Sequence, residues 1–337
     1  MLIALDAMGG DLAPDEVVRG ALLAADRLES QVALCGREDR IRALIDGHPG
    51  ADRMLVRSAT EVVEMEDSPR VALRGKPDSS VARTVEMVLN GEAQACVSAG
   101  NSGGFMALCH TRLKTIPGIA RPAIALFLPT KQGPRILLDA GANADCKPEY
   151  LVQFGLMGSI YAEFALGMKA PRVGLLSIGT EAHKGNELTQ AAMPLMGKAP
   201  INFIGNVEGD QIFTDDDVDV IVCDGFVGNV VLKVAEGVAG TLVDTLRTGI
   251  KRSAWARMGV LFMRGPFKAL RDLFDYGTYG GALLLGVNGI CVVSHGKSDA
   301  FAIKNALLVA ERAVKGRVVE HVRDTCRELF PEASVPA

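Results

Sequence analysis

Val220-Ile221-Val222-Cys223-Asp224-Gly225-Phe226-Val227-Gly228-Asn229 is a short apolar run that stops abruptly in a loop of Asp, Gly and Asn. The run is typical of a strand buried on both faces, and the spacing of the residues after it predicts a helix. The same pattern recurs at residues 3–11, 96–104, 136–143 and 173–181. These five units predict a three-layer α/β/α fold, in which helices cover both faces of a mostly parallel sheet.

The five loops share a composition that suits anion binding. Their small residues can bring bare backbone N–H groups up to a ligand, and the helix that follows adds partial positive charge. Because the carboxyl ends of parallel strands meet at one edge of a sheet, we expect the loops to gather there. The sequence therefore predicts a site for an anionic, phosphate-like group.

The alternation of strands and helices continues along the chain, and no linker or fixed-period repeat interrupts it. We therefore expect a single domain over residues 1–337, with a protruding helical hairpin at about 240–275. The expected strands lie near 31–35, 53–57, 93–98, 122–128, 135–139, 172–177, 201–205, 218–223, 282–286 and 290–294. The expected helices lie near 14–28, 37–46, 79–90, 102–113, 147–167, 225–251, 266–275 and from 299 onward.

The composition is ordinary for a soluble globular enzyme: 337 residues, 48% hydrophobic and 23% charged, with a net charge of −4. No uninterrupted apolar stretch reaches the roughly 18 residues of a membrane span. Asp6 and Asp11 fall where a signal peptide needs an apolar core. The seven cysteines are scattered, several of them inside apolar runs, which is typical of a reduced compartment. We expect a cytoplasmic protein.

Several standard motifs are absent from the sequence. No loop has the G-x-G-x-x-G spacing, and Gly296-Lys297-Ser298 fails as a P-loop because Cys291 stands where its first glycine is required. No recognisable metal-ligand spacing and no G-x-S-x-G elbow occurs. We therefore predict no cofactor, no metal and no nucleotide site. The sequence contains several potential anion-binding loops but no obvious covalent nucleophile. This favours chemistry in which the substrate supplies the nucleophile.

Two cysteines leave an alternative open. Cys146 and Cys223 stand beside the loop motifs, so either could carry an acyl group in a two-step reaction.

His183 and His295 follow strands in polar loops and could face the site. Asp215-Asp216-Asp217 is better interpreted as a solvated turn than as a metal cluster.

The window from Thr245 to Arg271 contains no Asp or Glu and carries a formal charge of +7. It follows a helix whose 3–4 spacing predicts one buried apolar stripe: Val227, Val230, Val231, Val234, Val238, Leu242 and Leu246. A basic island on an acidic protein favours a specific anionic partner over general nucleic-acid affinity. The tip could lie on an anionic membrane, dock an acidic protein, or pack against a dimer partner. The contact residues expected there are Arg252, Trp255, Arg257, Leu261, Phe262, Arg264 and Lys268.

The loops at 6–11, 98–101, 138–143, 202–209, 223–229 and 286–289 resemble the signature loops of the bacterial phosphate acyltransferase family. The resemblance runs from residue 1 to about 320, although Leu12 stands where a histidine is common and Ser102 where threonine is usual. These enzymes make acyl phosphate from acyl-[acyl carrier protein] and inorganic phosphate at the start of phospholipid synthesis. The resemblance implies a fold like isocitrate and isopropylmalate dehydrogenases and phosphotransacetylase, and a homodimer.

On this resemblance we expect phosphate to attack the acyl thioester directly. The residues predicted to be catalytic are Lys184, Asn229 and Lys233. The residues predicted to bind phosphate or substrate are Asp6, Gly9, Gly10, Arg74, Lys76, Gly100, Asn101, Ser102, Asp139, Asn143, Glu181, Asn206, Asp224, Gly225 and His295.

The expected partners are acyl carrier protein, a second copy of the chain and an anionic membrane surface, without nucleic acid. The membrane glycerol-3-phosphate acyltransferase that consumes the product is a further expected partner, and the protein should associate peripherally with the membrane. Two alternatives remain open: a non-catalytic membrane-surface adaptor and a phosphotransacetylase-like enzyme that uses acyl-CoA. A third rival with the same fold is a decarboxylating dehydrogenase. The last would need metal-binding aspartates and a nicotinamide site, and the sequence contains neither pattern.

Overall fold

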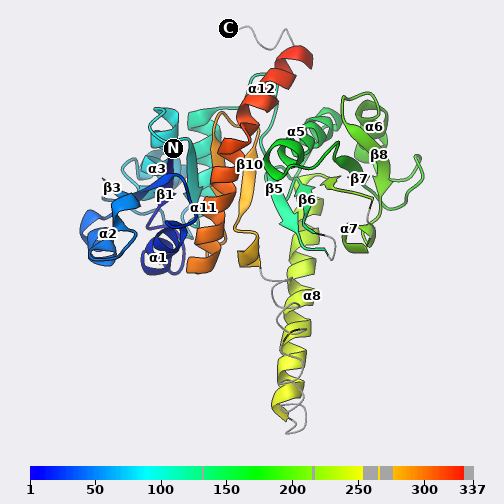
Figure 1. Ribbon diagram of the computed structural model, residues 1–337. Helices are drawn as coiled ribbons and strands as arrows, with labels where there is room; N and C mark the ends of the chain where they lie inside the picture. The colour runs from blue at the N-terminus through cyan, green and yellow to red at the C-terminus, as the bar shows by residue number, and fades with distance from the viewer. Residues whose placement is uncertain (131–132, 215–216, 253–264, 266–275, 330–337) are drawn as a thin grey trace.

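The computed structural model describes residues 1–130, 133–214, 217–252, 265 and 276–329 (Figure 1). The strands within these ranges are β1 (Leu2–Asp6), β2 (Gln31–Gly36), β3 (Met54–Ser58), β4 (Ala95–Ser98), β5 (Ala123–Leu128), β6 (Arg135–Leu138), β7 (Arg172–Leu176), β8 (Asn202–Val207), β9 (Val220–Val222), β10 (Ala282–Leu285) and β11 (Ile290–Val293). Together they form one sheet in the order β3-β2-β1-β4-β11-β10-β5-β6-β9-β7-β8. All the strands expected from the sequence are confirmed, within one or two residues at most ends.

The direction of the strands changes in the middle of the sheet. Strand β10 is antiparallel to both β11 and β5, and β5 is antiparallel to β6, whereas the other neighbours are parallel. Three reversals between β11 and β6 make the two parallel halves run in opposite directions. The loops after β1 and β4 therefore leave from the opposite end of the strands to the loops after β6, β7 and β9. The expectation that all five loops gather at one edge is wrong.

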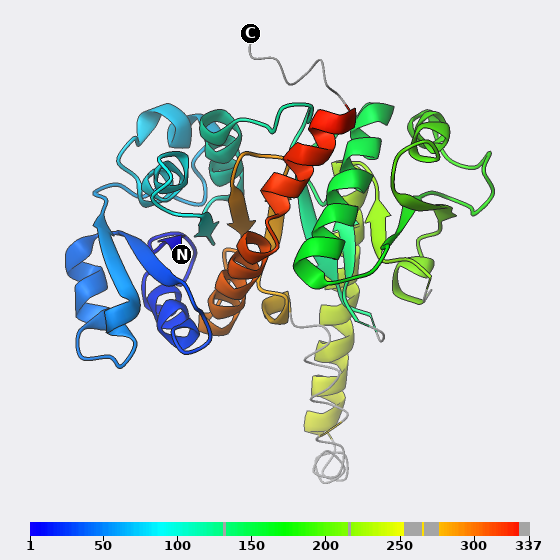
Figure 2. The ribbon, with the colours of Figure 1, turned by 45° about the horizontal axis from the view of Figure 1, so that its top comes forward.

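Helices cover both faces of the sheet, as the sequence predicts. Along β1, Ile3 and Leu5 join the core on one face, while Ala4 joins the core on the other. The first face is covered by α1 (Asp15–Ala24), α5 (Pro148–Leu166), α11 (Ala300–Lys315) and α12 (Val318–Leu329), and Figure 2 shows the last three crossing the middle of the sheet. The remaining helices are α2 (Glu38–Ile45), α3 (Ser80–Leu89), α4 (Ser102–Leu108), α6 (Glu187–Met196), α7 (Gln211–Thr214) and α8 (Gly225–Arg252).

Side-chain caps fix where several helices begin. Ser79, Asn101, Asn186 and Asp299 each accept a hydrogen bond from the backbone N–H three residues later, at the starts of α3, α4, α6 and α11. The expected helix at 102–113 divides into α4 and a π-helical turn, η3 (Cys109–Leu113). The sequence interpretation missed α6 and α7. The helix expected at 266–275 lies outside the described residues.

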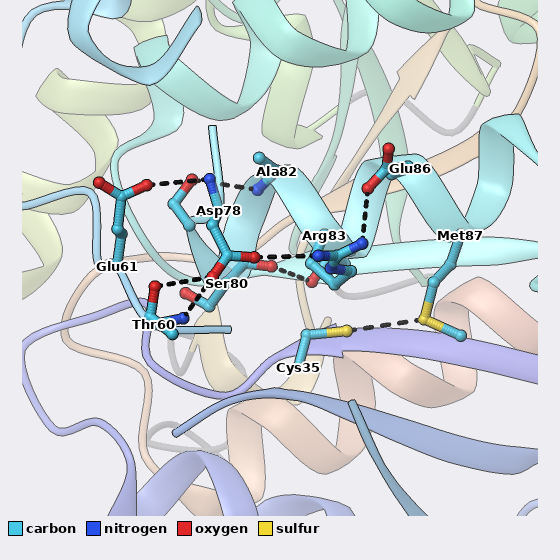
Figure 3. A network of polar contacts seen from close by, with 11 residues as sticks. Cys35, Thr60, Glu61, Asp78, Ser80, Ala82, Arg83, Glu86 and Met87 are labelled. Carbon is cyan, nitrogen blue, oxygen red and sulfur yellow. Dashed lines mark hydrogen bonds and ion pairs between the residues drawn. The ribbon is translucent and has the colours of Figure 1, made fainter. Parts of the chain in front are cut away.

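A network of charged side chains joins the start of α3 to the loop after β3 (Figure 3). The Asp78 carboxylate accepts hydrogen bonds from the Thr60 hydroxyl and from Arg83, and Arg83 also pairs with Glu86. These contacts lower the pKa of Asp78, the Thr60 hydroxyl most of all. Glu61 accepts from the backbone N–H of Asp78. The network holds the segment that carries Arg74 and Lys76.

Helix α8 leaves the body of the protein along most of its length (Figure 1). Val227 and Val231 pack against the sheet, but the other members of the predicted stripe (Val230, Val234, Val238, Leu242 and Leu246) are 42–59% exposed. The helical spacing is confirmed, and the expectation that this chain buries the whole stripe is wrong. Among the described residues, α8 is also the one helix long and apolar enough to cross a membrane. One such helix supports a membrane span only weakly, because the core helix of a soluble protein can have the same length and composition.

Candidate active site

A cavity of about 390 Å³ lies over β5, between α4 and α8. Its wall is largely apolar and includes Ile124, Leu126 and Leu128 from β5, with Met106 from α4 and Leu232 from α8. Its polar lining comes from four separate segments: Ser102, Asn229 with Lys233 and Glu236, Tyr279, and Ser294 with His295 and Ser298. The cavity can therefore hold a long apolar group with a polar reacting end.

Four of the predicted site residues line this cavity. They are Ser102, Asn229, Lys233 and His295. The cavity spans β5 from Ile124 to Leu128, so it connects the two ends of the sheet from which the two sets of loops leave. The strand reversals thus place the loops of the two halves on either side of a common cavity instead of along a common edge.

Lys233 is the cation of this set. Its Nζ lies 2.9 Å from Glu236 Oε2, and the Lys233 side chain is 57% exposed. An ion pair this exposed stabilises the protein by ~1 kcal/mol or less, so an incoming anion can compete for the lysine. Lys233 lies one helical turn after Asn229, which puts both side chains on the same side of α8.

The carboxylate of Asp139 is fully buried, and both of its oxygens accept hydrogen bonds from the protein. Its Oδ1 accepts hydrogen bonds from the backbone N–H groups of Ile124, Gly141 and Ala142, at 2.9–3.1 Å. Its Oδ2 accepts from the backbone and the side-chain amide of Asn143, at 2.7 and 2.9 Å. Five donors saturate a carboxylate. Asp139 and Asn143 therefore shape the loop after β6, and any effect on a substrate is indirect.

The start of α8 packs directly on that loop. Gly225 donates its N–H to the carbonyl of Asn143 at 2.7 Å, and Asp224 caps the helix by accepting from the N–H of Val227. A Cβ at Gly225 would lie 2.7 Å from that Asn143 carbonyl oxygen. The approach places the Asn229 side chain beside Gly141, where a Cβ would meet it at 3.7 Å. The small residues in the 220–229 segment are therefore needed for the start of α8 to pack on this loop.

The loops after β1 and β4 are joined in a similar way. The Ser98 hydroxyl donates to Asp6 Oδ2 at 2.7 Å and accepts from the N–H of Gly100 at 3.1 Å. Asp6 is buried, and burial raises the pKa of its carboxyl. Gly9 leaves no room for a side chain, since a Cβ there would lie 2.3 Å from Asp6 Oδ2. Gly10 has a φ of +113° and approaches the carbonyls of Ala99 and Gly296. These residues build the loop that carries α4.

Two further predicted residues hold the 62–67 loop. The Asn101 amide donates to the carbonyls of Glu64, Met65 and Asp67 at 2.7–3.1 Å, while its oxygen caps α4. Lys76 Nζ donates to Asp67 Oδ2 at 2.6 Å and to the Val62 carbonyl at 2.7 Å. The Lys76 hydrogen bond lowers the pKa of Asp67. Asn101 thus positions the neighbouring Ser102, whereas Arg74 is exposed.

Three further predicted residues lie outside the lining of the cavity: Glu181 and Lys184 on the loop after β7, and Asn206 on β8. Asn206 donates its side-chain amide to the carbonyl of Glu181 at 2.9 Å, and Lys184 donates its backbone N–H to the same carbonyl. Within the described ranges, Asn206 Oδ1 and Ser177 Oγ are buried without a hydrogen-bond partner. Buried polar atoms usually find a protein or water partner, so Ser177 Oγ after β7 and Asn206 Oδ1 on β8 have hydrogen-bonding capacity for a buried water or a polar ligand group.

Neither cysteine near the loops is suited to attack an acyl group. Cys146 is partly buried, and burial raises its pKa to about 11. Cys223 is buried beneath Asp139, and burial raises its pKa well above the ordinary value. The thiolate is the reactive form of cysteine, so both side chains remain poorly nucleophilic near neutral pH. This disfavours the two-step alternative.

Sequence reasoning missed part of the lining, including Met106, Phe213, Tyr279 and Ser298. One signal was available in the pair Gly280-Gly281, both of which have positive φ. A Cβ at Gly280 would lie 2.3 Å from the Asn305 backbone, so this glycine lets the chain pass directly against α11 just before β10. The apolar lining residues carry no such signal, because each resembles an ordinary core position.

Comparison with known proteins identifies the family. A family model described as "Fatty acid synthesis protein" matches residues 1–321. A phosphate acyltransferase from Desulfitobacterium hafniense (strain DSM 10664 / DCB-2) is 49% identical over 323 residues, which cover 96% of this chain and 97% of that relative. The identity extends over nearly the whole length of both chains.

Solved structures share the fold at low sequence identity. A phosphotransacetylase from Streptococcus pyogenes matches with a TM-score of 0.62 at 17% identity, covering 93% of this chain and 94% of that chain. A 4-hydroxythreonine-4-phosphate dehydrogenase from Klebsiella pneumoniae matches with a TM-score of 0.53 at 13% identity, covering 93% and 99%. These likenesses confirm the predicted kind of fold. The family model and the relative at 49% identity show that this chain belongs to the phosphate acyltransferase family.

Proposed function

We propose that the cavity over β5 is where an acyl thioester meets inorganic phosphate. The chain is an acyltransferase that forms acyl phosphate at the start of phospholipid synthesis, with acyl-[acyl carrier protein] as the donor. A phosphate oxygen attacks the thioester carbonyl carbon, the C–S bond breaks, and the phosphopantetheine sulfur leaves as a thiolate that then takes up a proton. The acyl chain ends on phosphate, and no group is left on the protein.

The observation that carries this proposal is the position of Asn229 and Lys233 on one apolar cavity with Ser102 and His295. Lys233 supplies positive charge to phosphate, while the Asn229 amide and the Ser102 hydroxyl can donate to the oxyanion that forms on the thioester. Removal of one such donor typically costs about 3 kcal/mol of transition-state stabilisation. The apolar wall along β5 suits the acyl chain.

The loop after β7 is proposed as a second substrate-binding element. Lys184, Glu181 and Asn206 do not line the cavity, but the two buried polar atoms at Ser177 and Asn206 suit a polar ligand there. Because Lys184 lies outside the cavity and Lys233 lines it, kinetics can distinguish the roles of these two lysines. Loss of Lys233 should slow the chemical step, whereas loss of Lys184 should act mainly on substrate binding.

The decisive experiment incubates the purified protein with acyl-[acyl carrier protein], with and without inorganic phosphate. Free carrier thiol and acyl phosphate should appear only when phosphate is present. Release of carrier at full rate without phosphate would contradict direct attack. Acyl-CoA in place of the carrier tests the phosphotransacetylase-like alternative, and faster turnover with acyl-CoA would favour it.

The dimer and the surface partners are also proposals. The exposed valine and leucine stripe of α8 suits a second copy of this chain, and this supports a homodimer. The basic window around Arg252 to Lys268 suits acyl carrier protein and an anionic membrane, and its tip lies outside the described residues. A cytoplasmic protein that binds membranes reversibly could pass a reactive lipid product to the membrane glycerol-3-phosphate acyltransferase.

A further inference from the structure

Three cysteines meet in the core beneath α4. Cys96 on β4, Cys291 on β11 and Cys109 on the π-helical turn η3 have their sulfur atoms within 4.8 Å of one another. Each of the three residues is 0% exposed. The sequence gives no sign of this cluster, since its members lie on three separate segments without metal-ligand spacing.

The fold explains why the three sulfurs converge. Strands β4 and β11 are parallel neighbours in which Cys96 and Cys291 are register partners, so both side chains lie on the same face of the sheet. The turn η3 follows α4 directly and brings Cys109 over that face. A π-helical turn is a rare, often functional interruption of a helix. The cluster therefore depends on an unusual local backbone.

The surroundings of the cluster are apolar. Its neighbours in this core include Ala4, Phe105, Leu108, Leu113 and Leu284. Cys35 belongs to the same core, but its sulfur lies 3.7 Å from Met87 Sδ (Figure 3). In the part of the chain that the structure describes, the group that could hold a metal consists of these three sulfurs alone.

We propose that Cys96, Cys109 and Cys291 form a closed three-sulfur site for a trivalent, thiophilic metalloid of the arsenite class. Sulfur–ion bonds of about 2.3 Å place three sulfurs around one ion at most about 4 Å apart, so the cluster needs only a small contraction. Each S–H proton leaves with one hydroxide of arsenite as water. Three As–S bonds form, three As–O bonds break, and no oxidation occurs.

The charge of the product decides between this ion and other soft ions. Three thiolates on trivalent arsenic give a neutral complex, whereas three thiolates carry a net charge of −1 with Zn²⁺ and −2 with Cu⁺. Charge is costly to bury where nothing compensates it. Zinc also prefers a fourth ligand.

Occupation of the cluster should affect the substrate cavity. Cys109 directly follows Leu108, the last residue of α4, while Ser102 and Met106 of the same helix line the cavity. Drawing Cys109 toward the sheet would move the end of this short helix. Acyl transfer, on the proposed function, should therefore fall as the cluster fills, but binding itself does not depend on that function.

The test adds arsenite to the folded, reduced protein and follows binding by native mass spectrometry. One arsenic should bind per chain with the loss of three protons, and arsenic X-ray absorption should show three sulfur neighbours. Cys109→Ser should lose binding. Cys326→Ser is the matched control, because Cys326 is equally buried on α12 but lies in a different core cluster, and it should bind as the wild type does.

Circular dichroism and arsenite-free turnover establish that Cys109→Ser is folded, and Cys291→Ala replaces it if it is not. Two sulfur neighbours instead of three would overturn the site, as would equal binding by Cys109→Ser and Cys326→Ser. Competition with zinc and monovalent copper tests the charge argument, and displacement of arsenic by either ion at equal concentration would refute it. The absorption experiment on the wild type decides the ligand number without any variant.

Discussion

Gly228 of α8 passes so close to the backbone of Asp139 that a Cβ at position 228 would lie 1.9 Å from the Asp139 carbonyl oxygen. The contact joins the helix that carries Asn229 and Lys233 to the loop after β6. It fixes how far these two side chains reach into the cavity. A change at Gly228 should therefore affect both stability and turnover.

Gly228→Ala should destabilise the protein by about 1–3 kcal/mol, because the new methyl group must push α8 away from the loop. Turnover should fall as well, since Asn229 moves with the helix. Urea unfolding and steady-state kinetics measure the two effects. Gly237→Ala on the same helix is the control, because a Cβ there meets nothing within 4 Å, and it should gain up to about 1 kcal/mol. Equal stability changes in Gly228→Ala and Gly237→Ala would mean that the contact with Asp139 does not contribute to stability.

Asn229→Ala should lower kcat by about 10²–10³, the loss typical of a missing oxyanion donor, and Lys233→Ala should have an effect of similar size because it removes the positive charge that faces phosphate. Lys184→Ala should mainly raise KM for one substrate, because its loop lies outside the cavity lining. Phosphate and acyl-carrier titrations separate the effects. Lys169→Ala, an exposed lysine beyond α5, should change nothing. Unaltered phosphate-dependent turnover in Lys184→Ala would remove that residue from the site.

Glu311 should make stability depend on pH in the acid range. Burial opposes its ionisation, but hydrogen bonds from the Ser30 hydroxyl and backbone, with Lys315, lower the pKa below its ordinary value of 4.5. A folded-state pKa below the unfolded one adds stability that is present above about pH 4.5 and is lost as the pH falls through the folded-state value. Glu311→Gln should flatten this part of the stability profile, as measured by thermal unfolding between pH 6 and pH 3. A wild-type slope that survives in the variant would assign it to other groups.

The exposed stripe of α8 should mediate self-association. Val234→Glu with Val238→Glu would put charge into an apolar contact, where each valine contributes up to about 1.5–3 kcal/mol when buried. Analytical ultracentrifugation should show a dimer for the wild type and a monomer for the variant. Glu236→Gln, a neighbouring polar change, serves as the control. A variant that remains dimeric would place the interface elsewhere.

Leu261→Glu with Phe262→Glu should release the protein from anionic vesicles and leave turnover in solution unchanged. The tip would lose two apolar groups and gain two charges that an anionic surface repels. Vesicle co-sedimentation at two salt concentrations measures the change. The same assay with neutral vesicles isolates the electrostatic part. Undiminished binding to anionic vesicles would show that the tip is not the point of contact.

The sequence by itself determined the local elements and the kind of protein. Short apolar runs located every strand near its observed place, because a strand buried on both faces needs apolar residues in succession. Small residues such as Gly225 marked a close approach, and the signature loops indicated the family. The sequence could not show that the Asp139 carboxylate accepts hydrogen bonds from the backbone of its own loop, because the fold decides which N–H groups lie near a carboxylate.

Only the tertiary structure decided how the loops are arranged. Whether β10, β5 and β6 run parallel or antiparallel depends on pairing between distant segments, which hydrophobic periodicity does not record. These reversals, not a shared edge, bring Ser102 and Asn229 to one cavity. The exposure of the α8 stripe is likewise decided by tertiary structure and not by the sequence pattern. A pattern tells which side chains need to be covered, whereas the covering surface lies elsewhere in the chain or on another molecule.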